Sequence, residues 1–222
     1  MKYVSCFIDL FLFSGKNRGM DGKQTREPTQ ERGIETRNRF IEAGISLFIE
    51  KGYYYTNTKE IARRAGAAVG SFYAYFEDKM DLFLAVIDHY NELILSGIQD
   101  DLRQLEIFSS EPKVLLRKIV ETTIKAHAVY PKLHNEIDLL EMKEPKVREK
   151  KSGVRDKSLE LLYQIIKVFD TQITHPDPEQ AAYLVYRLVE DGAHVANDPE
   201  EGIDPEVLVS EITLMIYRYL FL

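Results

Sequence analysis

Apolar residues recur three and four positions apart through most of the sequence after Gly33, and this spacing constrains the fold more than any other feature. It places the apolar side chains on one side of an α-helix, whereas a half-buried strand requires strict alternation. The clearest example is the stripe formed by Phe40, Ile41, Gly44, Ile45, Leu47 and Phe48. Because no convincing alternating stretch occurs, we expect an all-α protein.

Glycine, proline and capping residues divide this pattern into about nine helices. Thr58 and Asp78 are suitable N-caps, and Gly52 and Gly66 are suitable C-terminal residues because glycine readily adopts a positive φ. The expected helices cover residues 34–52, 58–66, 69–75, 78–97, 112–130, 132–143, 146–172, 178–196 and 205–221.

Composition and charge exclude several classes of protein. Apolar residues make up 45% of the 222 residues, which is enough to bury a core, and the lone Cys6 excludes an internal disulfide framework or a cysteine-based zinc site. No run of about 18 uncharged apolar residues is present, so a membrane-spanning helix is not expected. Residues 16–80 hold 12 Lys and Arg against 9 Asp and Glu, whereas residues 81–222 hold 16 against 26. A mildly basic front part joined to an acidic back part indicates that the front part faces an anion.

The first 19 residues combine Lys2 with a short apolar run and so resemble a secretory signal. Asp9 interrupts this run, and no Ala-x-Ala-like cleavage site follows it. We therefore expect translation to begin at Met20, and we interpret residues 1–32 as a flexible or mis-started arm. The alternative is an ordered or membrane-touching extra segment.

Two short helices joined by a turn at Gly66 form a candidate helix-turn-helix, a motif that places its second helix in the major groove of DNA. Small residues near the start of the second helix allow the backbone to approach closely, and flanking hydroxyls and cations reach phosphates. Short helices around a glycine are common in helical proteins, so the assignment needs further support.

A longer pattern resembles the DNA-binding domain of the tetracycline-repressor (TetR) family. Its first part reads Thr36-Arg37-x-x-x-Ile41-x-x-Gly44-x-x-Leu47-Phe48-x-x-x-Gly52-Tyr53. Its second part reads Thr58-x-x-Ile61-Ala62-x-x-Ala65-Gly66-x-x-x-Gly70-Ser71-Phe72-Tyr73-x-Tyr75-Phe76-x-x-Lys79-x-x-Leu82. The match covers residues 36–82. It implies an N-terminal three-helix helix-turn-helix domain over residues 33–80 and a larger C-terminal helical bundle for ligand binding and dimerisation over residues 81–222.

The resemblance also implies which residues meet DNA. The positions that resemble phosphate contacts are Thr58, Tyr73 and Lys79, and those that resemble backbone or minor-groove contacts are Thr36 and Arg37. The positions at which the family meets base edges or thymine methyl groups are Ala67, Ala68, Val69, Ser71 and Tyr75. Family members commonly carry Ser or Thr where Ala68 stands, so the recognition helix, expected over residues 69–75, lacks a side-chain cap. It offers few hydrogen-bond donors and is expected to read methyl groups and DNA shape.

The family resemblance implies a homodimer that binds a palindromic double-stranded DNA operator and responds to a small-molecule effector, usually as a repressor. We expect a cytoplasmic protein with no membrane contact and no cofactor. One alternative is a DNA-binding, architectural or protein-interaction module without ligand sensing, and another is a helical enzyme. The sequence contains no Gly-x-Ser-x-Gly, no phosphate-binding glycine loop and no His-Glu-x-x-His, which argues against an enzyme.

Aromatic and polar residues of the C-terminal region are candidates for the effector site, although each of them can equally belong to an ordinary core. The candidates are Phe108, His127, Tyr130, Met142, Tyr163, Phe169, Tyr183, Tyr186 and Glu190. Glu190 lies in an otherwise apolar stretch, where it can pair with a cationic ligand or form a salt bridge. His127, His134, Glu141 and His194 suggest a metal site, but Pro131 should break the helix that would align the first two. We therefore expect no metal.

The last two expected helices carry apolar stripes of the kind that form a four-helix dimer interface. Small residues predominate on the helix at 178–196 and larger ones on the helix at 205–221. The expected interface residues are Val185, Val189, Ala193, Leu208, Ile212 and Met215. The alternative is that these stripes pack inside one chain.

Overall fold

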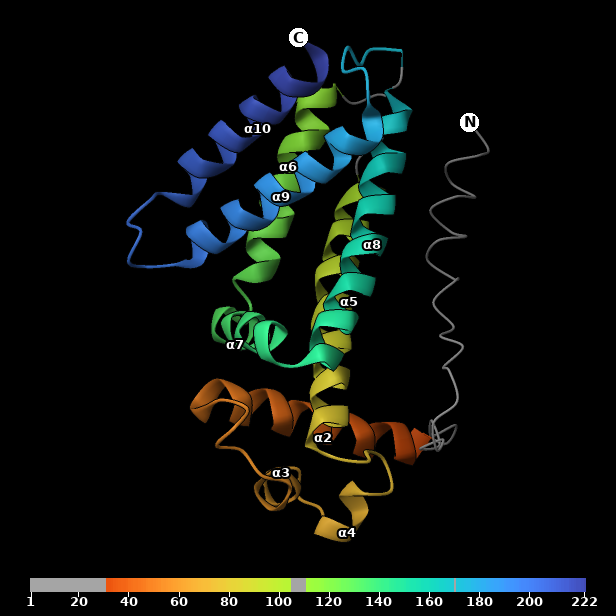
Figure 1. The fold of residues 1–222 in the computed structure, drawn as a ribbon, viewed down its shortest axis with the longest axis vertical. Coiled ribbons are helices and arrows are strands. Elements are labelled where there is room, and N and C mark those ends of the chain that lie inside the picture. Colours follow the sequence, from red (N-terminus) through yellow and green to blue (C-terminus); the bar gives the residue numbers. More distant parts are fainter. Residues whose placement is uncertain (1–30, 105–110, 170) are drawn as a thin grey trace.

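The computed structural model describes residues 31–104, 111–169 and 171–222, and within these ranges all regular structure is helical (Figure 1). The helices are α2 (Glu31–Lys51), α3 (Thr58–Arg64), α4 (Val69–Phe72), α5 (Lys79–Gln104), α6 (Pro112–His127), α7 (Pro131–Lys143), α8 (Pro145–Val168), α9 (Pro178–Asn197) and α10 (Pro205–Phe221). The expected all-α fold is confirmed. None of these helices is both long enough and apolar enough to cross a membrane. The expectations for residues 1–30 and for Phe108 lie outside the described residues.

Helices α2, α3 and α4 and the start of α5 enclose an aromatic core at one end of the molecule (Figure 1). Phe40 of α2 is fully buried and meets the rings of Phe72 and Phe76 edge to face, with ring centroids 5.6 and 6.2 Å apart. Gly44 of α2 leaves room for Leu82 of α5, since a Cβ at this position would lie 3.1 Å from Leu82 Cδ2. Truncating a buried phenylalanine costs about 3–5 kcal/mol. These contacts hold the two short helices on the longer α2 and α5.

Capping residues determine where α3 and α5 begin. The N-cap of α3 is Asn57 and not Thr58 as predicted, because the Asn57 side chain accepts a hydrogen bond from the backbone N–H of the third helical residue at 3.1 Å. Thr58 is instead the first residue of the helix. Asp78 caps α5 as predicted, with its carboxylate accepting a hydrogen bond from Asp81 N at 2.8 Å. Gly66, which follows α3, has a φ of 65°, a conformation that residues with a Cβ rarely adopt.

Every described helix after α5 begins with proline. The helix is broken before Pro131 as expected, because α6 ends at His127. Pro131 itself occupies the first turn of α7, where the missing N–H has no intrahelical partner to lose. Pro145 has the same position in α8, and α8 continues without a break through Gly153. These prolines therefore set the starts of new helices and the corners between them.

Helices α5, α6, α8, α9 and α10 form the larger helical bundle (Figure 1). Within it, α6 packs against α5, α9 and α10, and α8 packs against α5 and α9. A second core joins α6, α8, α9 and α10 and includes Val120, Ile124, Ile166, Ala181, Val185, Ile212 and Ile216. Gly192 of α9 allows α10 to approach closely, because a Cβ there would collide with Ile212 Cδ1.

Two helices connect the bundle to the N-terminal core. Helix α5 begins near α4 and runs alongside α8 into the bundle, whereas α7 lies between α2 and the bundle (Figure 1). In the turn after α2, Tyr53 donates its backbone N–H to Glu136 Oε1 of α7 at 2.5 Å, and the Tyr54 hydroxyl donates to Glu144 Oε1 at 3.0 Å. A displacement of α5 or α7 therefore acts directly on the N-terminal core.

Candidate functional site

Helix α4 and the turn before it form an exposed surface at the end of the N-terminal core (Figure 1). Phe72 is buried and anchors this single helical turn, whereas Ala68, Val69 and Gly70 at its start are exposed. Ala68 is the N-cap and makes no side-chain hydrogen bond, as expected from the sequence. The regular helix ends at Phe72 rather than at residue 75, because tighter turns follow it. Such a small, exposed helix start allows the backbone to approach base edges closely.

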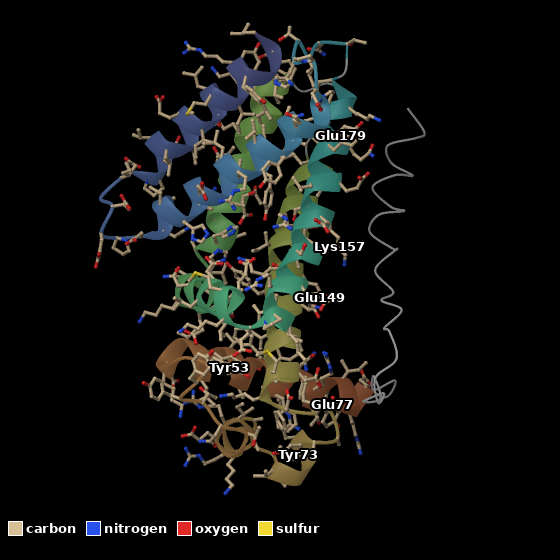
Figure 2. All side chains as sticks on the ribbon, viewed as in Figure 1. Tyr53, Tyr73, Glu77, Glu149, Lys157 and Glu179 are labelled. Carbon is tan, nitrogen blue, oxygen red and sulfur yellow. The ribbon has the colours of Figure 1, made fainter. Side chains whose placement is uncertain are left out.

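The Thr58 and Tyr73 hydroxyl oxygens lie 3.3 Å apart, within hydrogen-bonding distance. Thr58 belongs to the first turn of α3 and Tyr73 directly follows α4, so this pair links the two helices of the motif. Tyr73 is 54% exposed and lies at the end of the molecule away from α9 and α10 (Figure 2). The structure thus brings together two of the residues that resemble phosphate contacts.

Lys79, the third of these positions, holds the turn between α2 and α3. Its ammonium donates to the carbonyl oxygens of Tyr53 at 2.6 Å and Thr56 at 2.8 Å, and lies 4.1 Å from the centre of the Tyr53 ring. Burial, with a smaller effect of the Lys51 charge, lowers the pKa of Lys79. Because an ammonium has three N–H donors, at most one remains for a phosphate. Lys79 therefore has a structural role that the sequence pattern did not reveal.

The predicted base contacts differ in their access to DNA. Ser71 is partly exposed on α4. Ala67 and Tyr75 pack against the aromatic core, with the Tyr75 ring 5.9 Å from the ring of Phe40. Tyr75 is therefore less accessible to a base than the sequence suggested.

The remaining predicted contacts lie near the start of α2. Thr36 and Arg37 are partly exposed, and the Arg37 guanidinium lies 5.4 Å from the centre of the Phe76 ring. On α3, Arg64 forms a bidentate pair with Glu50 at 2.7 and 2.8 Å, so its guanidinium is already occupied by a carboxylate. The guanidinium groups of Arg37 and Arg64 thus contact other side chains of the domain itself.

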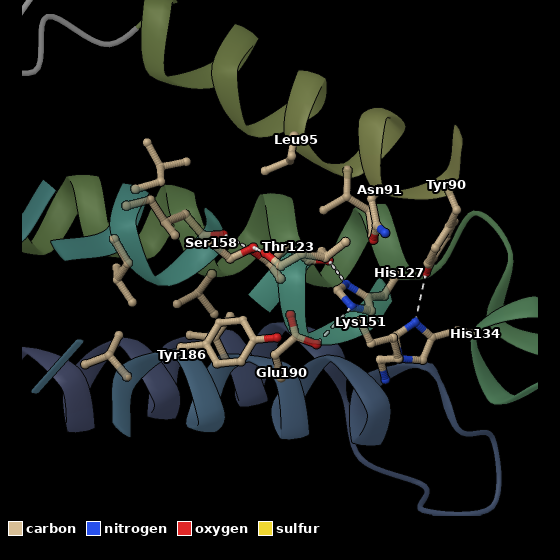
Figure 3. Close-up of a pocket in the computed structure, with 18 of the residues that line it drawn as sticks. Tyr90, Asn91, Leu95, Thr123, His127, His134, Lys151, Ser158, Tyr186 and Glu190 are labelled. Atoms are coloured by element: carbon tan, nitrogen blue, oxygen red, sulfur yellow. Dashed lines mark hydrogen bonds and ion pairs between the residues drawn. The ribbon is translucent and has the colours of Figure 1, made fainter. Parts of the chain in front are cut away.

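A cavity of about 120 Å³ lies in the bundle where α5, α6, α8 and α9 meet (Figure 3). Most of its wall is aliphatic and is formed by Ile87, Ile94, Leu95, Leu116, Ile119, Val120, Leu161, Leu162 and Ile165. Its polar end contains His127, His134, Lys151, Tyr186 and Glu190. An apolar cavity with a few polar groups at one end is typical of a small-molecule site.

Only some of the residues predicted to contact an effector line this cavity. Those that line the cavity are His127, Tyr186 and Glu190. Met142 and Tyr183 are 68% and 47% exposed, so neither contributes to it. Tyr130, Tyr163 and Phe169 pack against the hydrophobic cores instead. The prediction favoured aromatic residues, whereas the wall consists mainly of aliphatic residues of α5, α6 and α8, whose helical spacing is the same as that of any buried face.

His127 and Glu190 form an ion pair at the polar end, with Nε2 and Oε2 3.6 Å apart (Figure 3). Burial lowers the pKa of His127 and raises that of Glu190, but the interaction between the two side chains outweighs burial. The pKa of His127 is therefore raised and that of Glu190 is lowered. The cavity thus offers a charged pair to the polar group of a ligand.

The predicted dimer residues lie mostly inside one chain. Those buried in the second core are Val185, Val189, Ala193 and Ile212. Leu208 is partly buried, whereas Met215 is 55% exposed. The buried residues pack within one chain, because each helix of a bundle turns its apolar stripe toward its own core. The large apolar residues exposed on α9 and α10 are Tyr183, Leu184, Val207, Met215 and Tyr219.

The histidines lie together, contrary to the sequence argument. Pro131 forms a corner and begins α7, and this corner folds His134 back toward His127, with ring centroids 4.8 Å apart. The His134 and His194 ring centroids are 4.3 Å apart. The helix is broken before Pro131 as expected, but the break brings the histidine rings together and so gives no ground for excluding a metal.

Residues 40–86 match the family described as bacterial regulatory proteins, tetR family. The chain is 32% identical over 91 residues to the HTH-type transcriptional activator FasR of Mycolicibacterium smegmatis, which is 40% of each chain. It is 45% identical over 69 residues to the HTH-type transcriptional regulator HbdR of Aromatoleum sp., which is 29% of this chain and 30% of the other. The chain therefore spans less than half the length of these curated relatives.

Solved structures resemble the chain over a longer range. Fatty acid degradation regulator FadR from Bacillus halodurans covers 82% of this chain and 94% of its own, with a TM-score of 0.68 and 18% identity. Transcriptional regulator FadR from Bacillus subtilis, in complex with stearoyl-CoA, covers 82% of this chain and 98% of its own, with a TM-score of 0.66 and 19% identity. At such identities the likeness establishes the fold alone. The match over residues 40–86 relates the helix-turn-helix segment to the tetR family of bacterial regulatory proteins, and the solved structures show that the fold is shared over most of the chain.

Proposed function

We propose that this chain is a dimeric, sequence-specific DNA-binding repressor whose operator affinity is lowered by a small apolar effector with one polar group. The observation that carries the DNA-binding part is the exposed start of α4, held on a buried aromatic core within the segment that matches the family. Relatives named as transcriptional activators and regulators support a role in transcription.

In this proposal α4 enters the major groove with Ala68, Val69 and Ser71 toward the bases. The methyl groups of Ala68 and Val69 contact thymine methyl groups, and the Ser71 hydroxyl donates to or accepts from a base edge. Thr58 and Tyr73 hydrogen-bond to phosphates and fix the register of α4 on the duplex. The exposure of Tyr73 and the short distance between the two hydroxyl oxygens support this role.

The aliphatic cavity and its polar end support an amphiphilic effector. A dry apolar cavity of about 150 Å³ holds benzene, so the cavity volume of about 120 Å³ accommodates only a small molecule without rearrangement. The B. subtilis FadR structure contains stearoyl-CoA, a far larger amphiphile. An effector of that kind requires α5 and α8 to separate along their aliphatic faces.

Separation of α5 from α8 provides the link to DNA binding. The N-terminal end of α5 carries Lys79, which holds the turn before α3. Displacement of this end shifts α4 relative to its counterpart in the dimer, and operator half-sites are about 34–36 Å apart. The effector must bind the displaced arrangement more tightly, because equal affinity for both arrangements shifts nothing.

A second copy of the chain is proposed to cover the exposed apolar residues of α9 and α10. Leu184 and Met215 are 52% and 55% exposed although both are large and apolar. Their burial by a partner also links two recognition helices, as a palindromic operator requires.

Selection of the full-length chain against a pool of random DNA duplexes tests the proposed function. We expect enrichment of a palindromic site with half-sites about one helical turn apart. Ser71→Ala should change the ranking of site variants, whereas Ser96→Ala, on α5 in the bundle, should leave the ranking unchanged. Failure to enrich any sequence, or an unchanged ranking for Ser71→Ala, would contradict the assignment of α4.

A further inference from the structure

Three histidines and two carboxylates converge where α6, α7 and α9 meet, beside the polar end of the cavity. Figure 3 shows three of them, His127, His134 and Glu190. His134 and Asp138 lie one turn apart on α7, and His194 comes from α9. His127 of α6 and Glu190 of α9 lie next to this group. The proposed regulator function gives no role to Asp138 or His194, and His134 enters it only as part of the cavity wall.

The donor atoms of three of these residues form a nearly regular triangle. His134 Nε2 lies 2.9 Å from His194 Nε2 and 3.5 Å from Asp138 Oδ2, and His194 Nε2 lies 3.6 Å from the same oxygen. With bonds of about 2.0–2.1 Å, two ligands of a tetrahedral Zn²⁺ are about 3.3–3.4 Å apart. The three donors therefore match one face of such a tetrahedron to within about half an ångström.

Outer contacts orient two of these ligands. The Tyr90 hydroxyl lies 3.2 Å from His134 Nδ1, which leaves Nε2 directed at the triangle. Lys151 hydrogen-bonds to Asp138 Oδ1 and lies 2.8 Å from Glu141 Oε2, so that Asp138 Oδ2 faces the histidines. Metal-binding imidazoles and carboxylates characteristically have such partners, which fix the tautomer and the direction of the lone pair.

The surroundings also suit a cation that enters from solvent. Asp138, Glu141 and Glu190 provide three carboxylates, whereas the ammonium groups are those of Lys151, which pairs with the first two, and of Lys132 in the adjoining surface pocket. An open surface pocket lined by both histidines of the triangle connects the site to solvent. An incoming ion therefore meets an excess of carboxylates and has a path to its ligands.

We propose that His134, Asp138 and His194 bind a divalent first-row transition-metal ion, with Zn²⁺ as the first probe. Two imidazole nitrogens and one carboxylate oxygen form a donor set that such ions accept, whereas Ca²⁺ and Mg²⁺ prefer oxygen ligands. A fourth position remains on the side of His127 and Glu190 for water or a ligand donor. The ion cross-links α7 to α9, so binding should also stabilise the fold.

Metal titration of the full-length chain, after treatment with a chelator and dialysis, tests this site. By calorimetry we expect one Zn²⁺ per chain with a Kd below about 1 µM. Co²⁺ should give the visible absorption of a tetrahedral complex, and Zn²⁺ should raise the thermal unfolding midpoint. Absence of binding in this range would overturn the proposal.

A variant and a matched control identify the ligands. His194 is partly exposed, so His194→Gln should fold, and we expect its Zn²⁺ affinity to fall at least about tenfold with loss of the Co²⁺ spectrum. His89→Gln, on α5 outside the cluster, should bind as the wild type does. If circular dichroism shows that His194→Gln is unfolded, Asp138→Asn replaces it. Unchanged Zn²⁺ affinity in a folded ligand variant would overturn the assignment.

Discussion

Replacing Lys79 by methionine should destabilise the N-terminal core, because its ammonium bonds two carbonyl groups of the turn between α2 and α3. A hydrogen bond to a charged group contributes about 1.5–3 kcal/mol, and water can replace part of this at a half-buried position. The contact with the Tyr53 ring, 4.1 Å from the ammonium, adds about 0.5–1 kcal/mol. Methionine retains the apolar stem, so the expected loss is about 2–4 kcal/mol.

Urea unfolding of the full-length chain, followed by circular dichroism, measures this loss. With slopes of about 1–3 kcal/mol per molar, the midpoint should fall by about 1 M or more. Lys59→Met is the matched control, since Lys59 is exposed on α3 and its replacement should change stability by less than about 0.5 kcal/mol. Equal midpoints for the two variants would refute the structural role of Lys79.

Further substitutions test other parts of the structure. Gly66→Ala should lower the free energy of unfolding by about 1–2 kcal/mol, and Gly66→Asn should lower it less. The cause is the φ of 65°, since no atom lies within 4 Å of an added Cβ. Equal urea midpoints for Gly66→Ala and wild type would contradict this. Met215→Glu should yield folded monomers in sedimentation, because Met215 is exposed, whereas Ile212→Glu should unfold the bundle, because Ile212 is buried. If the Met215→Glu variant is still a dimer, the exposed face of α10 is not the dimer interface. Glu136→Ala should lower stability by about 1–3 kcal/mol because it leaves Tyr53 N without its acceptor, and Glu136→Gln should lower it less; urea midpoints that do not separate the two would argue against this contact.

The helical architecture was predictable because amphipathic spacing and glycine turns are local signals. Because these signals are local, they do not report the packing that decides at which residue a helix begins. Pro131 can end one helix or begin the next, and only the packing of α7 against α2 and α8 shows that it begins one. Asn57 and Thr58 are both good N-caps, and the backbone selected the first.

The sites were less predictable because they depend on which helices meet. An apolar stripe such as the one that contains Val185 reads the same whether it faces its own core or a partner chain. His134 and His194 lie 60 positions apart in the sequence, so no local spacing indicates that their nitrogens are 2.9 Å apart. Lys79 matched a family position for phosphate contact, but its two carbonyl partners come from a turn more than 20 residues earlier.

Hydroxyl-radical footprinting on the selected duplex tests the central claim, that α4 places this protein on DNA. The account predicts two protected patches related by a twofold axis and about one helical turn apart. Val69→Asp puts a negative charge at the exposed start of α4 and should abolish the footprint, whereas Val114→Asp, at an exposed position of α6, should preserve it. A footprint that persists unchanged in folded Val69→Asp would contradict the account.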